Sequence, residues 1–204
     1  YDTFMEYTTK AYASEKSPLE LSFIPIHPGD ILSYGGYHFE VKLLKGHTFG
    51  QCGLYEPEKK LMFVGDQLMT TIVPIVGTQE TDLGMLKCYL DSLGDLKHNY
   101  KDCYFLPCHY GEIRNVEKEV NRIILGYLEK CEIMKHVLEE AGTALTTRDI
   151  GVRTYGRSQG PPDYAHFASC TYIWAKTFSC MEYMMGEGFI ERSERDGIIY
   201  WKAL

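Results

Sequence analysis

The first half of the chain alternates apolar and polar residues in short runs, a pattern typical of β-strands. Every second residue of 37–43 is apolar, and a Gly-Gly pair at 35–36 directly before this run predicts a turn between two strands. Residues 53–57 and 59–66 form a second pair of apolar runs joined across a proline, and residues 102–109 predict a short buried strand. We therefore expect a β-sheet within residues 21–110.

Two later segments of the chain have apolar residues at helical spacing. Residues 79–97 place leucines on one face of a predicted helix, with Asp82 in its first turn. From Val116 the apolar positions keep a spacing of three and four up to Gly142. This second pattern predicts one long helix that links two structural units. Residues 1–20 are weakly helical.

The end of the chain, residues 143–204, has a different order of elements. Thr146 predicts the N-cap of a short helix, and residues 165–186 predict a longer one. An Asp-Gly pair at 196–197 between two alternating runs predicts a β-hairpin. The apolar face expected for the longer helix consists of Phe167, Cys170, Trp174, Phe178, Met181 and Met185.

The order of helices and hairpin in this last part is typical of a winged-helix module. We therefore predict two domains, residues 1–142 and residues 143–204. We expect the aromatic residues of the second domain, including Tyr172 and Trp201, to pack in its core rather than to stack on nucleic-acid bases.

Composition narrows the function classes. The chain has 204 residues, 45% of them hydrophobic, which is enough for a substantial core. Its net charge of −7 argues against a general affinity for nucleic acid or for an anionic membrane surface. No apolar run reaches the roughly 18 residues that a transmembrane helix needs. The seven cysteines are scattered and odd in number, so we expect reduced thiols and a cytoplasmic location.

Three ionisable residues, His47, Asp66 and His109, each follow the end of a predicted strand. Imidazole and carboxylate are zinc ligands, and the glycines before His47 and Asp66 permit sharp backbone bends. The pattern therefore predicts a metal site, with the alternative that each histidine is an ordinary surface or core residue. Cys52 and Cys108 lie close to these positions, and we expect them to be small buried thiols rather than further ligands.

The ordered motifs around these residues resemble the metallo-β-lactamase superfamily over residues 21–142. The family's succession of an acidic-glycine turn, a Gly-Gly hairpin, a Gly-His-Thr-x-Gly turn and a strand ending in Gly-Asp is matched by PIHPGDILSYGGYHFEVKLLKGHTFGQCGLYEPEKKLMFVGD. Its later Pro-Gly-His-Gly turn is similar to LPCHYG, although Cys108 and Tyr110 replace glycines. The family's principal motif, His-x-His-x-Asp-His, is not found in these 204 residues.

This resemblance implies an α/β fold: half of an αββα sandwich, followed by a winged-helix-like domain as in a subgroup typified by β-lactamase-like protein 2. It implies that His47 is the third histidine of a first metal site, that Asp66 bridges two metals, and that His109 is the last histidine of a second site. The implied cofactor is zinc, as one or two ions, or another divalent metal.

The implied function is metal-dependent hydrolysis of an ester, thioester, lactam or phosphodiester, active once the missing N-terminal half is supplied. The alternative is a non-catalytic interaction module that keeps the half-sandwich and the winged helix.

The expected partners follow from the same resemblance. A hydrolase takes a small-molecule substrate, and the sheet face built by alternate residues of 37–66 lacks the cover that the first half of the sandwich provides. We therefore expect this face to pair with an N-terminal half-domain or with a second copy of the chain. Charge does not support nucleic acid as a partner, because the tail from Ala144 balances seven basic residues against seven acidic ones. We expect no membrane partner.

Overall fold

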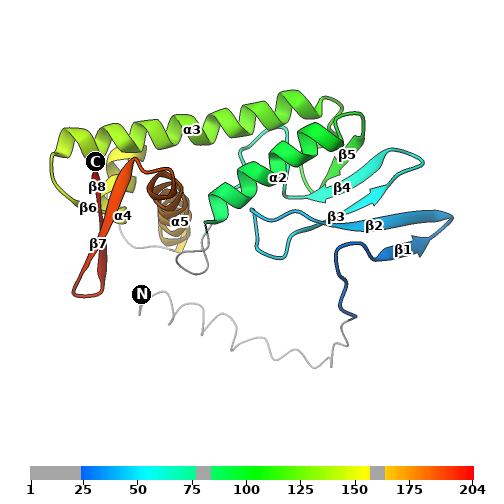
Figure 1. Cartoon of the computed structure of the whole chain (residues 1–204), viewed down its shortest axis with the longest axis horizontal. Coiled ribbons are helices and arrows are strands. Elements are labelled where there is room, and N and C mark those ends of the chain that lie inside the picture. The colour runs from blue at the N-terminus through cyan, green and yellow to red at the C-terminus, as the bar shows by residue number, and fades with distance from the viewer. Residues whose placement is uncertain (1–23, 77–83, 157–163) are drawn as a thin grey trace.

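The computed structural model describes residues 24–76, 84–156 and 164–204, with the side chains of residues 164–171 left out of the description. The helix expected within residues 1–20 therefore lies outside the described residues. Figure 1 shows a sheet at one end of the molecule, a hairpin at the other, and one long helix that runs along both. The architecture is mixed α/β, as the sequence predicts.

Five strands form the first sheet, in the order β1-β2-β3-β4-β5. The first four pair antiparallel, whereas β4 and β5 pair parallel because the helix α2 connects them. Gly35 and Gly36 have φ angles of 58° and 81°, which confirms the predicted two-residue turn. The strands are β1 (Ile31–Tyr34), β2 (Tyr37–Leu43), β3 (Cys52–Glu56), β4 (Leu61–Gly65) and β5 (Tyr104–Pro107).

The two faces of this sheet have different surroundings. Met62, Val64 and Phe105 are fully buried on one face, in the same hydrophobic cluster as residues of α2 and α3. We call this the helix face. Because successive residues of a strand point to opposite sides, the alternate positions form the other face, which we call the open face. Its apolar residues include Leu32, Tyr34, Tyr37, Phe39, Val41, Leu43, Leu54, Phe63 and Leu106.

The long helix α3 spans Val116–Ala141, and its predicted bounds are confirmed. The side chain of Asn115 caps the first turn by accepting a hydrogen bond from the N–H of Lys118 at 2.9 Å. Gly142 ends the helix in the left-handed conformation, with φ 60°.

The helix α2 spans Met85–Asn99 with Gly84 as its N-cap, so it begins six residues later than the predicted residue 79 and ends two residues later than predicted. Residues 77–83, and with them the expected first-turn Asp82, lie outside the described residues. The buried face of α2 includes Tyr89, which apolar spacing had not indicated, and its ring meets that of Tyr127 edge to face.

The tail forms a second, three-stranded sheet in the order β6-β8-β7, with two helices. The hairpin predicted at Asp196-Gly197 is confirmed, and so is the N-cap, where the Thr146 hydroxyl accepts from the N–H of Asp149 at 3.2 Å. The short strand β6, which pairs with β8, was not predicted. The elements are β6 (Leu145–Thr146), α4 (Thr147–Tyr155), α5 (Tyr164–Gly186), β7 (Ile190–Arg195) and β8 (Ile198–Ala203).

The face predicted for α5 is partly wrong. Phe178 and Met185 are half buried and pack against the hydrophobic cluster as predicted, whereas Trp174 is half buried and Tyr172, expected in the core, is 59% exposed. Met181 is buried as expected, whereas the side chains of Phe167 and Cys170 lie outside the described residues. The fully or almost fully buried positions are Thr177, Ser179, Cys180, Met181, Glu182 and Met184.

The reason is that α5 packs against α2, α3, α4 and β7, so more than one of its sides is covered. Its buried hydroxyls have acceptors: Thr177 donates to the carbonyl oxygen of Ile173 at 2.7 Å, and Ser179 lies within hydrogen-bonding distance of the carbonyl oxygens of Val76, at 2.9 Å, and Ala175, at 3.0 Å. Polar residues whose hydrogen bonds are made in this way can be buried, and a prediction from apolar spacing alone does not identify them.

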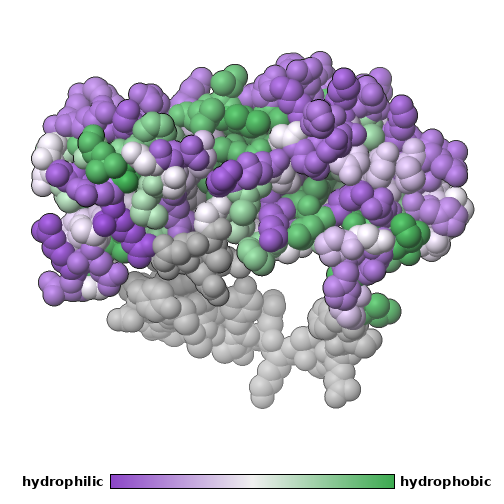
Figure 2. All heavy atoms as spheres, viewed as in Figure 1, coloured by the Kyte–Doolittle hydropathy of each residue, from purple (hydrophilic) through white to green (hydrophobic). Residues whose placement is uncertain are grey.

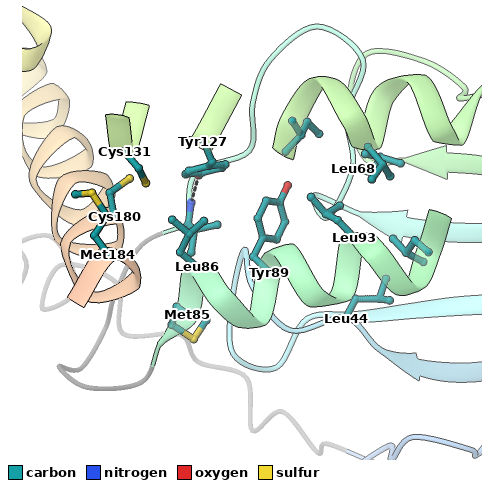
Figure 3. Close-up of a cluster of buried hydrophobic side chains, with 14 of the residues drawn as sticks. Leu44, Leu68, Met85, Leu86, Tyr89, Leu93, Tyr127, Cys131, Cys180 and Met184 are labelled. Carbon is teal, nitrogen blue, oxygen red and sulfur yellow. Dashed lines mark hydrogen bonds between the residues drawn. The ribbon is translucent and has the colours of Figure 1, made fainter. Parts of the chain in front are cut away.

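One hydrophobic cluster extends from Leu44, next to the sheet, to Trp201 in the tail. Figure 3 shows its middle part, where side chains of α2, α3 and α5 meet. Figure 2 shows hydrophobic side chains gathered between α2 and α3, with hydrophilic ones along the rim. The tail therefore packs on the same core as the sheet, and the division into two domains stays a prediction. Among the described residues, no helix is long and apolar enough to cross a membrane.

Candidate functional site

The three predicted site residues lie at one edge of the first sheet. β2 and β4 are both antiparallel to β3, and β5 is parallel to β4, so the carboxyl ends of β2, β4 and β5 meet at the same edge. His47, Asp66 and His109 follow these three ends. The Nε2 atom of His47 lies 3.7 Å from Oδ2 of Asp66, and the Nε2 atom of His109 lies 3.6 Å from Oδ1. The structure thus brings both histidines to one carboxylate.

Close packing explains the two glycines before these residues. Gly46 has φ 146°, and a Cβ atom there would come within 2.6 Å of the Cα of Tyr89 in α2. Gly65 has φ 57°, and a Cβ atom would collide with the side-chain amide of Gln51. Both positions therefore need glycine, for the backbone conformation and for the space.

A backbone carbonyl fixes the orientation of His47. Its Nδ1 atom lies 2.7 Å from the carbonyl oxygen of Ile75. A carbonyl oxygen only accepts hydrogen bonds, so Nδ1 carries the proton and donates. In the neutral ring, Nε2 then presents its lone pair toward Asp66. Ile75 lies 28 residues further along the chain, and no sequence signal had indicated its role.

The carboxylate of Asp66 is only partly satisfied. Its Oδ1 atom is buried and accepts no hydrogen bond from the described residues. A buried acceptor without a partner is costly, by about 1–3 kcal/mol. The neighbouring His109 lies in a more open position, with a side chain that is 61% exposed.

The loops around Asp66 are tied to the helices behind the sheet. Tyr89 of α2 donates from its hydroxyl to the carbonyl oxygen of Gln67 at 2.8 Å. Tyr127 of α3 donates to the carbonyl oxygen of Pro74 at 2.6 Å and accepts from the N–H of Val76 at 2.8 Å. Burial raises the pKa of both tyrosines, so the hydroxyls stay protonated as donors. These bonds hold the segment that carries Ile75.

The distances between the histidine nitrogens and the aspartate oxygens allow each histidine–aspartate pair to bind one metal ion. Two ligand atoms at about 2.0–2.2 Å from one zinc ion lie roughly 3–4.5 Å apart, and both histidine–aspartate distances fall in this range. Within the described part of the chain, however, no group of three or more His, Cys, Asp or Glu residues is arranged to hold one ion. The site therefore consists of two incomplete pairs that share Asp66.

A cavity of about 580 Å³ opens in front of this edge. Its size is within the range of small-molecule sites, about 300–1,000 Å³. The polar groups of the lining come from the three site residues, from Thr48, and from the hydroxyls of Tyr110 and Tyr172. The tail contributes Tyr172 and Ala175 from α5. Sequence reasoning missed the tail's contribution, because more than one hundred residues separate it from His47.

The expectations for the two nearby cysteines need correction. Cys108 is exposed rather than buried, because it lies in the turn after β5, outside the helix-covered core. Cys52 is half buried, and its thiol donates to the carbonyl oxygen of Gly50 at 3.4 Å. Neither is part of the cavity lining.

Comparison with known proteins defines the fold class. A metallo-β-lactamase family protein of Thermus thermophilus, TTHA1429, superimposes with a TM-score of 0.74 at 20% identity, covering 98% of this chain and 64% of that one. A β-lactamase domain protein of Burkholderia ambifaria superimposes with a TM-score of 0.81 at 18% identity, covering 100% of this chain and 59% of that one. The chain therefore has the metallo-β-lactamase fold over the part that it shares with these proteins, which confirms the predicted resemblance.

Sequence comparison adds a shorter match. No family model matches the chain. Hydroxyacylglutathione hydrolase GloC of Haemophilus influenzae is 50% identical over 40 residues, which is 20% of this chain and 19% of that protein. The chain spans less than two thirds of each of these relatives.

Proposed function

We propose that this chain is part of a metal-dependent hydrolase of the metallo-β-lactamase superfamily, and that His47, Asp66 and His109 hold its metal, zinc or another divalent ion. The fold and the short match to a hydrolase support the class. The observation that carries the proposal is the position of Asp66, which faces the Nε2 atoms of both histidines at 3.6 and 3.7 Å.

The orientation of His47 favours a cation between it and Asp66. With the proton on Nδ1, a neutral His47 turns a lone pair toward a negative carboxylate, and the two repel each other. Nε2 of His47 and the carboxylate of Asp66 would both act as ligands of a metal ion, which would remove this repulsion, and the hydrogen bond to Ile75 is the kind of outer contact that orients metal-binding histidines. A second proton, on Nε2, would also remove the repulsion, so metal binding is tested directly below.

The chain's own residues have separate tasks in this hydrolase. Asp66 brings negative charge to a half-buried position, where one carboxylate oxygen faces His47 and the other faces His109. The side chain of His109 is exposed, so it has room to change its orientation when the metal binds. When bound, the metal supplies Lewis acidity, which activates water at neutral pH and polarises the substrate oxygen. The cavity next to the site receives the substrate.

Completion of the site requires further ligands. Zinc prefers about four ligands per ion, and the described residues offer two incomplete pairs. The open face of the sheet supports the idea that an N-terminal half-domain, or a second copy of the chain, supplies them. Tyr37, Leu43 and Phe63 are 40–41% exposed on this face, although Val41 of the same face is fully buried, and exposed apolar surface on a sheet is typical of an interaction site.

Titration of the chain with zinc by calorimetry tests the proposal. We expect binding that Asp66→Ala abolishes and that His38→Ala leaves unchanged, because His38 lies on an exposed strand away from the cavity. If Asp66→Ala binds zinc as tightly as the native chain, the assigned site is wrong. Hydrolysis is then tested after mixing the chain with its N-terminal half, using ester, thioester, lactam and phosphodiester substrates.

The open face also favours a second candidate, a non-catalytic interaction module. This candidate predicts that the reassembled sandwich forms but binds no zinc. Zinc binding by the reassembled sandwich, lost with Asp66→Ala, would exclude it.

A further inference from the structure

One part of the cavity lining, which we call the apolar wall, differs chemically from the site residues. Three of its residues, Met69, Ile72 and Ile75, belong to the segment after β4, and two, Tyr172 and Ala175, belong to α5. None of these side chains carries a charge. A substrate that binds in the cavity therefore meets both ionisable groups and an apolar surface.

Part of this apolar wall is exposed to solvent and can contact a ligand. Ile72 is 42% exposed and Tyr172 is 59% exposed, although both are large side chains. Covering such surface on binding contributes about 25 cal/mol for each Å² of apolar area. The exposure of Ile72 and Tyr172 is thus explained if part of a substrate covers them.

The wall is also held in place before any ligand binds. Arg122 of α3 donates through its guanidinium to the carbonyl oxygens of Met69 at 2.5 Å and of Ile72 at 3.3 Å. Glu119 accepts from the same guanidinium at 2.8 Å. A surface fixed in this way loses little conformational entropy on binding.

Charge selects what this wall can accept. Among the described residues that line the cavity, none is lysine or arginine. Two cations of the described helices have other partners: Arg122 donates to loop carbonyls, and Lys176 of α5 lies over the ring of Tyr127 at 4.8 Å. An anionic group placed against the wall would lose its hydration and gain no opposite charge.

We propose that the substrate carries an uncharged apolar group, an aliphatic chain or an aromatic ring, next to the bond that is hydrolysed, and that Ile72 and Tyr172 bind it. This inference rests on the hydrolase function proposed above. The cavity of about 580 Å³ has room for such a group, since it equals roughly twenty times the volume of one water molecule.

Binding of 1-alkanols from butanol to octanol, measured by calorimetry on the full chain without added metal, tests the wall alone. We expect the affinity to rise about fourfold for each added methylene, the factor that burial of one CH₂ group predicts. Ile72→Ser should weaken octanol binding about tenfold, because it removes most of the apolar contact at one position.

Two matched variants serve as controls. Ile133→Ser changes an isoleucine of almost the same exposure, 43%, on α3 and away from the cavity. Phe63→Ser removes an apolar side chain from the open face, the other surface on which an alkanol could bind. Both should leave octanol affinity unchanged. Tyr172→Ser gives a second test of the wall if Ile72→Ser does not fold, as judged by circular dichroism.

An affinity that does not depend on chain length, or a loss with Phe63→Ser or Ile133→Ser equal to that with the wall variants, would overturn the inference. Because the alkanols need no metal, the result is independent of the zinc titration. Alkanol binding at the wall without zinc binding would support an apolar binding site and contradict the proposed hydrolase function. Zinc binding without alkanol binding would support the hydrolase function and contradict the proposal that the substrate carries an apolar group.

Discussion

The Nδ1–H group of His47 donates a hydrogen bond to the carbonyl oxygen of Ile75 at 2.7 Å, and this bond turns Nε2 toward Asp66. The segment that carries Ile75 is in turn held by Tyr127 from α3. A chain of contacts thus connects the long helix to the orientation of one imidazole. Each link makes a prediction.

The two nitrogen atoms of His47 can be tested separately. In the variant His47→Asn, the new side-chain amide can still donate to Ile75 but offers no nitrogen lone pair to a metal, whereas His47→Ala loses both functions. We expect both variants to lose zinc binding in calorimetry. Only His47→Ala should also lose stability, by about 1 kcal/mol in urea unfolding. Zinc binding retained by His47→Asn would contradict the proposed role of Nε2.

Gly46 should tolerate no side chain. In Gly46→Ala, the new methyl group would meet the backbone of Tyr89, and the positive φ adds strain, so we expect a loss of about 2–4 kcal/mol in unfolding free energy. Gly50→Ala, in the same loop, is the matched control: a Cβ atom there meets nothing within 4 Å, and stability should change by less than about 0.5 kcal/mol. Equal stabilities of the two variants would show that α2 does not constrain the loop.

Tyr127→Phe should destabilise the protein although it removes a single oxygen atom. The change leaves the buried N–H of Val76 without its acceptor, which costs about 1–3 kcal/mol. Tyr37→Phe removes the same atom from a side chain that is 41% exposed and should be almost neutral. Thermal and urea unfolding measure both, and a neutral Tyr127→Phe would mean that the segment is held by other contacts.

The half-buried Lys176 predicts a pH dependence of stability. Burial lowers its pKa, with the nearby Lys130 acting in the same direction and Cys131 and Cys180 opposing it. The unfolded chain therefore binds more protons than the folded one between the lowered pKa and the ordinary value of 10.5, so Lys176 makes stability rise with pH in that window.

Lys176→Met removes this contribution. We expect the variant to be more stable than the native chain at pH 8, with an advantage that shrinks as the pH rises to 10. The thiol of Cys180, whose pKa is raised by its hydrogen bond to Cys131 and by burial, acts in the opposite direction in both proteins. Lys176 lowers the pKa of this thiol, so its removal strengthens the opposing contribution of Cys180 and also makes the advantage of the variant shrink as the pH rises. Urea unfolding at several pH values checks this, and an advantage that is constant with pH would refute it.

The open face should mediate association. We expect the chain to sediment as a pair at micromolar concentration, or to pair with its N-terminal half. Phe63→Glu should weaken this association at least tenfold, because it places a charge on the contact surface. Phe189→Glu is the matched control, since Phe189 is a phenylalanine of similar exposure, 48%, that lies in the tail and not in the five-stranded sheet. This variant should associate as the native chain does. A native chain that stays monomeric, alone and with the N-terminal half, would contradict the prediction.

Much of the local structure could be predicted from the sequence because the signals are local. The Gly35-Gly36 and Asp196-Gly197 turns have backbone conformations that few other residue pairs adopt, and both are confirmed. The bounds of α3 follow from a regular apolar spacing and from the glycine at its end. The spacing of α5 was misleading, because packing on several sides buries polar residues such as Thr177 and exposes Tyr172.

The sequence by itself determined which residues are candidates for the site, because His47, Asp66 and His109 each stand where a strand ends. Only the tertiary structure decided that these ends meet, since strand order and direction depend on pairing between distant segments. It also decided the tautomer of His47 through Ile75 and the cavity wall contributed by α5. Contacts of this kind join residues that are far apart in the chain, and the periodicity of a single segment carries no information about them.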